Sequence, residues 1–249
     1  MQPLRALWNT LADVLWPRTC AVPSCSRPCD RAERHICSRC FAALPFHEAG
    51  GACDICGALV SARTTHAFIC SDCRAKRPAF EHARSALVYE NEVEQLVQTF
   101  KFRKGVWLTE DFVDLLEGAA RAHLAAAEID VIVPVPLHPN RERQRGYNQC
   151  ALLAEALAAR LDRRADCTSF ARVRDTPKQS RLSEEERRKN LKPEDFAVTH
   201  PDNLRGRTVL LLDDVMTSGR TLSICSQVLL AAGVSRVWAL TLARALRRT

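Results

Sequence analysis

Two adjacent carboxylates, Asp213 and Asp214, follow an aliphatic run and closely precede a string of small and hydroxylated residues. In chain order, that string consists of Met216, Thr217, Ser218, Gly219, Arg220 and Thr221. Small residues let backbone N–H groups approach an anion, hydroxyl groups add donors, and the start of a following helix favours negative charge. Because carboxylates bind sugar hydroxyls or Mg2+, the stretch has the chemistry to hold a phosphorylated ribose.

We expect both carboxylates to lie outside the apolar core, because an unpaired buried charge is costly. The strand TVLLL (208–212) is then expected to end before them, with at least one carboxylate outside the strand pairing, since neighbours in a strand face opposite ways. The alternative is that the stretch binds no ligand and is a buried strand that ends in polar residues, followed by an ordinary helix cap. The sequence contains neither a GxxxxGKT-type loop nor GxGxxG, which disfavours sites for nucleoside triphosphates and dinucleotides.

Cysteines form a second group of chemically capable residues, with nine of the twelve located between Cys20 and Cys73. The later cluster consists of two CxxC pairs: Cys53 with Cys56, and Cys70 with Cys73. Each pair brings two thiolates to one ion, and the two pairs complete a tetrahedron. This spacing predicts a closed, structural zinc site.

The earlier cluster is less regular. Cys37 and Cys40 form a clear pair, whereas three cysteines compete for the other two places: Cys20, Cys25 and Cys29. We assign Cys20 and Cys25 and leave Cys29 as a spare, with His35 as an alternative ligand. Two structural Zn2+ ions per chain are therefore predicted. Such a zinc ribbon is expected to be scaffold, although it can also contact nucleic acid or a partner.

The composition places few limits on the ligand. The formal net charge is +7, from 36 basic and 29 acidic residues, which suits phosphate esters and nucleic acid alike. No apolar run approaches the roughly 20 residues of a membrane helix, so we expect no membrane span. Polar residues interrupt the N-terminal segment where a signal peptide stays apolar. Clustered cysteines without disulfides suit a reducing compartment, and we predict a cytoplasmic protein.

The elements that position these residues fall into three zones. Residues 1–17 predict an amphipathic helix, residues 18–80 hold the cysteine clusters, and residues 81–249 alternate short apolar runs with amphipathic helices. That alternation is typical of a parallel sheet flanked by helices. The expected strands are 85–89, 131–136, 208–212 and 237–243, and the expected helices are 93–102, one beginning near 109, 148–161 and 221–232. A polar segment, 171–195, contains a capping-box pattern at 183–186.

The stretch VLLLDDVMTSGRTL (209–222) resembles the phosphoribosyl pyrophosphate (PRPP) motif of type I phosphoribosyltransferases. Three further stretches resemble the ComF/GntX family of competence-associated proteins: FKFRKG (100–105), VIVPVPLHPNRERQRGYNQ (131–149) and TPKQSRLSEEERRKNLKPEDF (176–196). This resemblance implies an α/β fold: a type I phosphoribosyltransferase-like domain behind a small N-terminal double zinc ribbon.

The resemblance also implies roles for individual residues. Asp213 and Asp214 would hold the ribose hydroxyls, directly or through Mg2+, and Thr217 to Thr221 would surround the 5′-phosphate. The loop of Pro136, Leu137 and His138 would bind pyrophosphate, with a strained or cis peptide turning N–H groups inward. Three cations would neutralise the pyrophosphate: Arg141, Arg145 and Lys101. The segment 171–195 would close over the site.

Three functions are compatible with this set. The first is a phosphoribosyltransferase, transferring a pentosyl group to an unidentified acceptor. The second is a PRPP-binding protein without catalysis. The third is an accessory protein of natural competence that binds single-stranded DNA and works with DNA-uptake proteins. One fold hosts many functions, so family membership alone does not choose among them.

Overall fold

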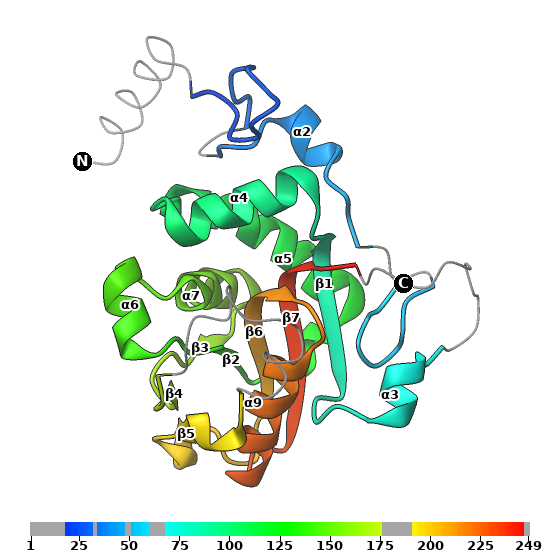
Figure 1. Ribbon diagram of the computed structural model, residues 1–249, viewed down its shortest axis with the longest axis vertical. Helices are drawn as coiled ribbons and strands as arrows, with labels where there is room; N and C mark the ends of the chain where they lie inside the picture. The colour runs from blue at the N-terminus through cyan, green and yellow to red at the C-terminus, as the bar shows by residue number, and fades with distance from the viewer. Residues whose placement is uncertain (1–17, 32–33, 48–50, 60–67, 176–190, 247–249) are drawn as a thin grey trace.

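Five parallel strands form the central sheet, in the order β1-β7-β6-β2-β3 (Figure 1). The computed structural model describes residues 18–31, 34–47, 51–59, 68–175 and 191–246. The helix predicted over 1–17 and the capping box at 183–186 lie outside the described residues. The strands are β1 (His82–Val88), β2 (Val131–Pro134), β3 (Arg164–Ala165), β6 (Thr208–Met216) and β7 (Arg236–Arg244).

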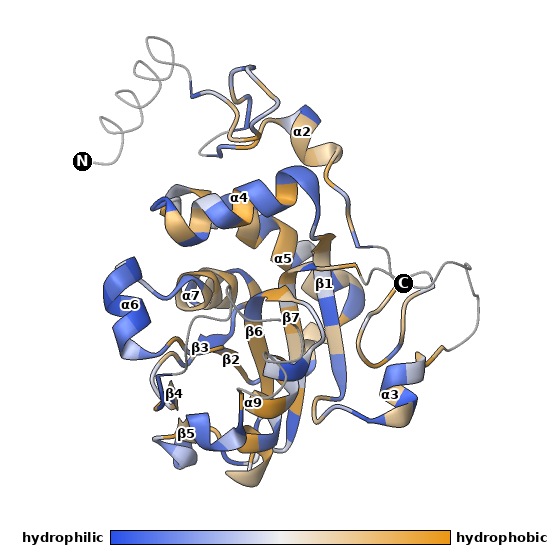
Figure 2. Cartoon of the chain, viewed as in Figure 1, coloured by the Kyte–Doolittle hydropathy of each residue, from blue (hydrophilic) through white to orange (hydrophobic). Residues whose placement is uncertain are grey.

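Helices cover both faces of this sheet. On one face lie α4 (Asn91–Phe102), α5 (Thr109–His123) and α7 (Gln149–Leu161), and on the other lies α9 (Arg220–Ala231). Side chains alternate along β6 accordingly: Leu210 and Leu212 join the apolar cluster of α5 and α7, whereas Val209 and Leu211 join that of α9. Because both faces are buried, β6 and β7 are almost continuously apolar (Figure 2).

The predicted parallel sheet flanked by helices is confirmed, and most boundaries differ from the prediction by a few residues. Besides the two-residue strand β3, the short helices beside the cysteines and the 3-10 helices, two elements were not predicted. The first is α6 (Pro139–Arg145), whose charged sequence carries no apolar periodicity. The second is a hairpin of β4 (Phe170–Arg172) and β5 (Phe196–Val198), which flanks the polar segment and is supported by stacking of Phe170 on Phe196 at 5.6 Å. Short 3-10 helices complete the described chain: Val106–Leu108, Ala126–Glu128, Pro193–Asp195 and Pro201–Asn203.

Each cysteine cluster belongs to a small lobe with one short helix, α2 (Ser38–Ala42) or α3 (Ser71–Ala75). The two lobes pack on different parts of the domain: Cys20 and Cys37 share the apolar cluster of α4 and α5, while Cys53 and Cys56 share that of α9. The lobes are therefore integrated into the two cores of the α/β fold.

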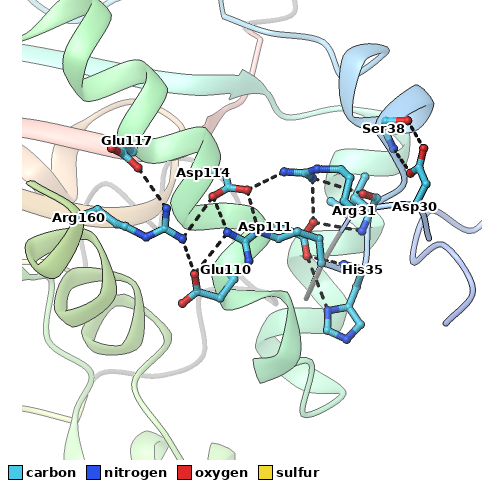
Figure 3. Close-up of polar contacts among 11 residues, drawn as sticks. Asp30, Arg31, His35, Ser38, Glu110, Asp111, Asp114, Glu117 and Arg160 are labelled. Atoms are coloured by element: carbon cyan, nitrogen blue, oxygen red, sulfur yellow. Dashed lines mark hydrogen bonds and ion pairs between the residues drawn. The ribbon is translucent and has the colours of Figure 1, made fainter. Parts of the chain in front are cut away.

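Charged contacts join the first lobe to α5 (Figure 3). Asp111 is fully buried and accepts hydrogen bonds from the backbone N–H groups of His35 and Ile36, at 2.8 and 3.1 Å. The Arg31 guanidinium donates to Asp111 at 3.1 Å and to Asp114 at 2.6 Å. Two carboxylates on successive turns of one helix thus hold the first lobe in place.

Candidate functional site

The topology predicts a crevice where β2 and β6 lie side by side. The chain leaves β2 toward α7 on one face of the sheet and leaves β6 toward α9 on the opposite face. In open parallel sheets, ligands bind at the carboxyl ends of two such strands, because the following segments diverge there. The loop 135–138 after β2 and the loop 217–219 after β6 both begin at this end of the sheet.

The acidic pair lies within β6, not after it. The strand continues to Met216, and Asp213 is in register with Thr241 of β7. Asp214 is only 5% exposed. The expectation that both carboxylates lie outside the core is wrong for Asp214. That expectation assumed that a buried carboxylate would have no counter-charge, whereas Asp214 is paired with Lys101.

Asp214 has polar partners on two helices. Its Oδ1 lies 2.7 Å from the Lys101 ammonium of α4, and its Oδ2 accepts a hydrogen bond of 2.6 Å from the Gln149 amide of α7. Burial lowers the pKa of Lys101, but the neighbouring carboxylates of Asp214 and Asp213 outweigh that effect and the pKa is raised. Asp214 is therefore the counter-ion of an internal lysine.

Asp213 has a different environment. Its Oδ1 accepts the backbone N–H of Asp214 at 2.8 Å and lies 3.4 Å from the Cys150 thiol. Burial, reinforced by the charge of Asp214, raises the pKa of Asp213 to about 7. This carboxylate lines a small cavity together with the residues of the following loop: Val215, Met216, Thr217, Gly219, Arg220, Thr221 and Leu222. Asp213 is the member of the pair that borders the cavity.

The loop after β6 is open to solvent at Thr217 and Ser218, whereas Gly219 is buried. Gly219 has φ of +76° and immediately precedes α9, a twelve-residue helix. The positive φ favours glycine here, and a Cβ would lie 2.5 Å from the Cε at the end of the Met216 side chain, which would have to move. The Arg220 guanidinium donates to the Leu191 carbonyl at 2.9 Å, which fixes it at the start of the helix.

The loop after β2 is formed by Pro136, which is buried, and by Leu137 and His138, which are partly exposed. His138 accepts the Asn140 N–H at its Nδ1 (3.2 Å) and so begins α6. No cis peptide occurs among the described residues, and none of these three residues has a positive φ. The predicted strained or cis peptide is therefore wrong for this conformation.

The predicted pyrophosphate cations occupy different positions. Arg141 lies on α6 and is partly exposed. The Arg145 guanidinium contacts the Gln149 side chain and lies 5.0 Å from the centroid of the Phe102 ring. Because Gln149 also binds Asp214, a polar network extends from the end of α6 to β6 and Lys101. Sequence reasoning assigned no role to Gln149, although it ends the stretch 131–149 that carries the family resemblance.

Both cysteine clusters assemble as four thiols. The first contains Cys20, Cys25, Cys37 and Cys40, and the second Cys53, Cys56, Cys70 and Cys73; within each set the sulfurs lie within 4.8 Å of one another. Tetrahedral zinc with bonds of about 2.3 Å separates its sulfurs by about 3.8 Å. The measured pairs, Cys25–Cys37 at 4.0 Å and Cys56–Cys70 at 3.7 Å, fit that geometry. Cys29 is outside the first set, and the His35 ring faces Asp111.

The clusters are built alike. In each, the first cysteine of the second pair precedes a short helix and donates its N–H to an earlier sulfur: Cys37 to Cys20 and Cys70 to Cys53, both at 3.4 Å. Each cluster also has an arginine beside its sulfurs. Arg27 donates to Cys25 at 3.4 Å and to Cys40 at 3.5 Å in the first cluster, and Arg244 approaches Cys56 at 3.7 Å in the second.

Comparison with known proteins shows which family this chain resembles. The family model described as the phosphoribosyl transferase domain matches residues 147–249 of this chain. Competence protein F of Haemophilus influenzae is 31% identical over 86% of this chain and 92% of its own. The DNA utilization protein YhgH of Salmonella typhimurium is 32% identical over 87% and 94%. Competence protein ComFC of Bacillus subtilis is 28% identical over 82% and 81%.

Proposed function

Because this chain belongs to the ComF family of competence and DNA utilization proteins, we propose that it binds PRPP at the β2–β6 edge and acts in DNA uptake. One observation carries the proposal of PRPP binding. Asp213 borders a cavity whose other wall is the glycine-led start of α9, so a hydroxyl acceptor and a phosphate-binding helix terminus share one pocket.

The proposed roles follow from position. The Asp213 carboxylate accepts hydrogen bonds from the ribose hydroxyls, and the N–H groups of Thr217 to Thr221 bind the 5′-phosphate. The loop 136–138 and Arg141 bind the pyrophosphate. Lys101 acts through Asp214, whose charge it balances. Because Asp214 is paired with Lys101, Asp213 is the carboxylate proposed to bind Mg2+. Mg2+ takes one or two carboxylates plus substrate phosphates and would neutralise the pyrophosphate.

The chemistry proposed for this site needs no protein nucleophile. The bond between the anomeric carbon and pyrophosphate breaks, pyrophosphate leaves with the electron pair, and an acceptor forms the new bond to the cationic ribosyl carbon. The negative charge of Asp213 and the N–H groups around both phosphates stabilise the charges that develop. The acceptor is not identified by the described residues, so transfer is proposed as a reaction class only.

Binding is tested by titration calorimetry of the full-length protein with PRPP and Mg2+. We expect a saturable isotherm that ribose 5-phosphate weakens by competition. Pyrophosphate release is then followed while nucleobases, amines and single-stranded DNA are offered as acceptors. Absence of PRPP binding would refute the proposal, whereas binding without pyrophosphate release would assign the protein a non-catalytic role.

Zinc is proposed for both cysteine clusters, since four thiolates are its preferred structural ligand set. Reduced thiols suit a reducing compartment, which supports a cytoplasmic location. No helix of the described chain is both long and apolar enough to span a membrane.

A second candidate function, binding of single-stranded DNA, is favoured by one exposed surface. Phe102 is 70% exposed and the Arg145 guanidinium lies over its ring, while Arg103 and Lys104 are exposed beside it. Nearby in the chain, Trp107 is 42% exposed. Aromatic rings with flanking cations are the usual means of binding single strands without strong sequence preference.

The Phe102 surface is tested by the affinity for an oligothymidine at several salt concentrations. We expect binding that weakens steeply with salt, because phosphate contacts displace counterions. Phe102→Ala should weaken it about tenfold, as stacking contributes roughly 1–3 kcal/mol per base. Phe46→Ala is the matched control, since Phe46 is also an exposed aromatic residue, at 46%. Equal loss in both variants, or no binding at low salt, would rule out this surface.

A further inference from the structure

A buried arginine connects the second cysteine cluster to the phosphate-binding loop. Arg244 is the last residue of β7 and is only 4% exposed. Its Nη1 donates to the Cys56 carbonyl at 2.6 Å and lies 3.0 Å from the Met216 sulfur, and its Nη2 approaches the Cys56 sulfur at 3.7 Å. A single guanidinium therefore contacts a predicted metal ligand and the last residue of β6.

Charge indicates why this arginine is tolerated in the interior. A buried cation is costly without a counter-charge. In the part of the chain that the structure describes, the guanidinium partners of Arg244 are Cys56 and Met216, with no carboxylate among them. Four thiolates around one Zn2+ carry a net negative charge. The metal-loaded second cluster is thus the counter-ion that this position requires.

Met216, which Arg244 contacts, lies at the candidate PRPP site. Met216 is 2% exposed and lines the same small cavity as Asp213 and Thr217. Its Cε lies against Gly219, the residue that precedes α9. Beside it, the Ala245 N–H donates to the Met216 carbonyl at 2.9 Å. Met216 therefore packs directly against the loop 217–219 at the point where it enters α9.

We propose that Arg244 is a positioning residue that couples metal occupancy of the second cluster to binding of the ribose phosphate. With zinc bound, Arg244 is held on Cys56 and supports Met216, so the loop is ready for the anion. This inference rests on the proposed function. Because coupling between two sites is reciprocal, PRPP must also retain the zinc of the second cluster.

The chain offers a matched control and a single-residue probe. Arg27 lies beside the sulfurs of the first cluster, and its guanidinium donates to Cys25 and Cys40. The sequence contains two methionines, Met1 and Met216, so carbon-13 labelling of methionine methyl groups yields one signal from the site. Met216→Leu assigns that signal.

The experiment uses the full-length, zinc-loaded protein in three forms: the parent, Arg244→Leu and Arg27→Leu. We expect Arg244→Leu to weaken PRPP binding about tenfold and to shift the Met216 methyl signal, whereas Arg27→Leu changes PRPP affinity less than about twofold. In the parent, saturating PRPP should slow the release of one zinc to a chromogenic chelator by about tenfold, and loss of that zinc should shift the Met216 signal.

The outcomes separate the two claims. If the parent binds PRPP but Arg244→Leu binds it equally well, and zinc release is the same with and without PRPP, the coupling is overturned and the proposed function stands. If the parent does not bind PRPP, the proposed function fails and the coupling fails with it. If Arg244→Leu does not fold, zinc release from the parent decides: protection of one zinc supports the coupling, and no protection overturns it.

Discussion

At the scale of residues, the acidic pair of the PRPP-like motif is divided between two tasks. Asp214 is buried and balances Lys101, and Asp213 borders the cavity. The two carboxylates are neighbours in sequence, and each places an oxygen within 4.8 Å of the other and of the Cys150 sulfur, but their remaining partners differ. Substitutions at the two positions should therefore have different consequences.

We expect Asp213→Asn to weaken PRPP binding ten- to a hundredfold with little loss of stability, because it removes a charged acceptor at the cavity. Asp214→Asn should instead lower the free energy of unfolding by about 3–5 kcal/mol, since it leaves the Lys101 ammonium without its counter-ion. Calorimetry with PRPP and urea denaturation measure the two effects. Equal effects of both substitutions on binding and stability would contradict the division of tasks.

The pH dependence should identify Asp213. Its pKa of about 7 in the folded protein exceeds the roughly 3.9 of an unfolded chain. Between about pH 4 and pH 7 the folded state thus binds more protons, so this group's contribution to stability is lost as the pH rises through that window. The ionised carboxylate is the acceptor for ribose hydroxyls, and PRPP binding should strengthen from pH 6 to pH 8. The changes of stability and of PRPP affinity with pH should both be smaller in Asp213→Asn than in the parent. The titration of PRPP itself contributes equally to both proteins.

At the scale of elements, each cysteine lobe is a loop and a short helix arranged around four thiols. The repeated N–H to sulfur bond and the adjacent arginine orient the thiols in the same way in both lobes. Neither α2 nor α3 is long enough to be stable alone, because a first helical turn is costly to form. A bound ion would therefore supply much of the order of each lobe.

Metal analysis checks the assignment of the irregular first cluster. Cys29→Ser should retain two zinc ions per chain, because its sulfur is outside the set of four. Cys25→Ser should retain one, since it removes one of those four ligands. A parent protein with a single zinc would show that the first cluster does not hold metal, and loss of zinc from Cys29→Ser would show that the ligands are misassigned.

At the scale of the whole molecule, the cysteine lobes and the α/β domain share their apolar cores. Fully buried Ile36 packs in the cluster of α4 and α5, and buried Ile55 packs in that of α9. Asp111 and Asp114 add polar contacts between the first lobe and α5 (Figure 3). A division into units 1–17, 18–80 and 81–249 remains a prediction, but the shared cores imply that the lobes and the domain stabilise one another.

Asp111→Asn should therefore destabilise the whole chain. Burial raises the pKa of Asp111, and the N–H donors of His35 and Ile36 and the charge of Arg31 oppose that rise. Breaking a buried pair costs about 3–5 kcal/mol, which we expect as a lower midpoint of one cooperative urea transition. Asp202→Asn is the control, because Asp202 and its partner Arg205 are 94% and 68% exposed and such pairs contribute about 1 kcal/mol or less. Two separate transitions in the parent would contradict the shared core.

The sequence by itself determined the alternation of the longer strands with helices, the regular second set of four cysteines and the location of the candidate site in the chain. These depend on local periodicity, on CxxC spacing and on a contiguous motif. Only the tertiary structure decided that β6 extends through both carboxylates and which of them is neutralised. Gln149 and Asp214 are 65 residues apart, and Arg244 and Cys56 are 188 apart. No local pattern encodes such pairs, because the burial that makes each charge need its partner exists only after the sheet and its helices have packed.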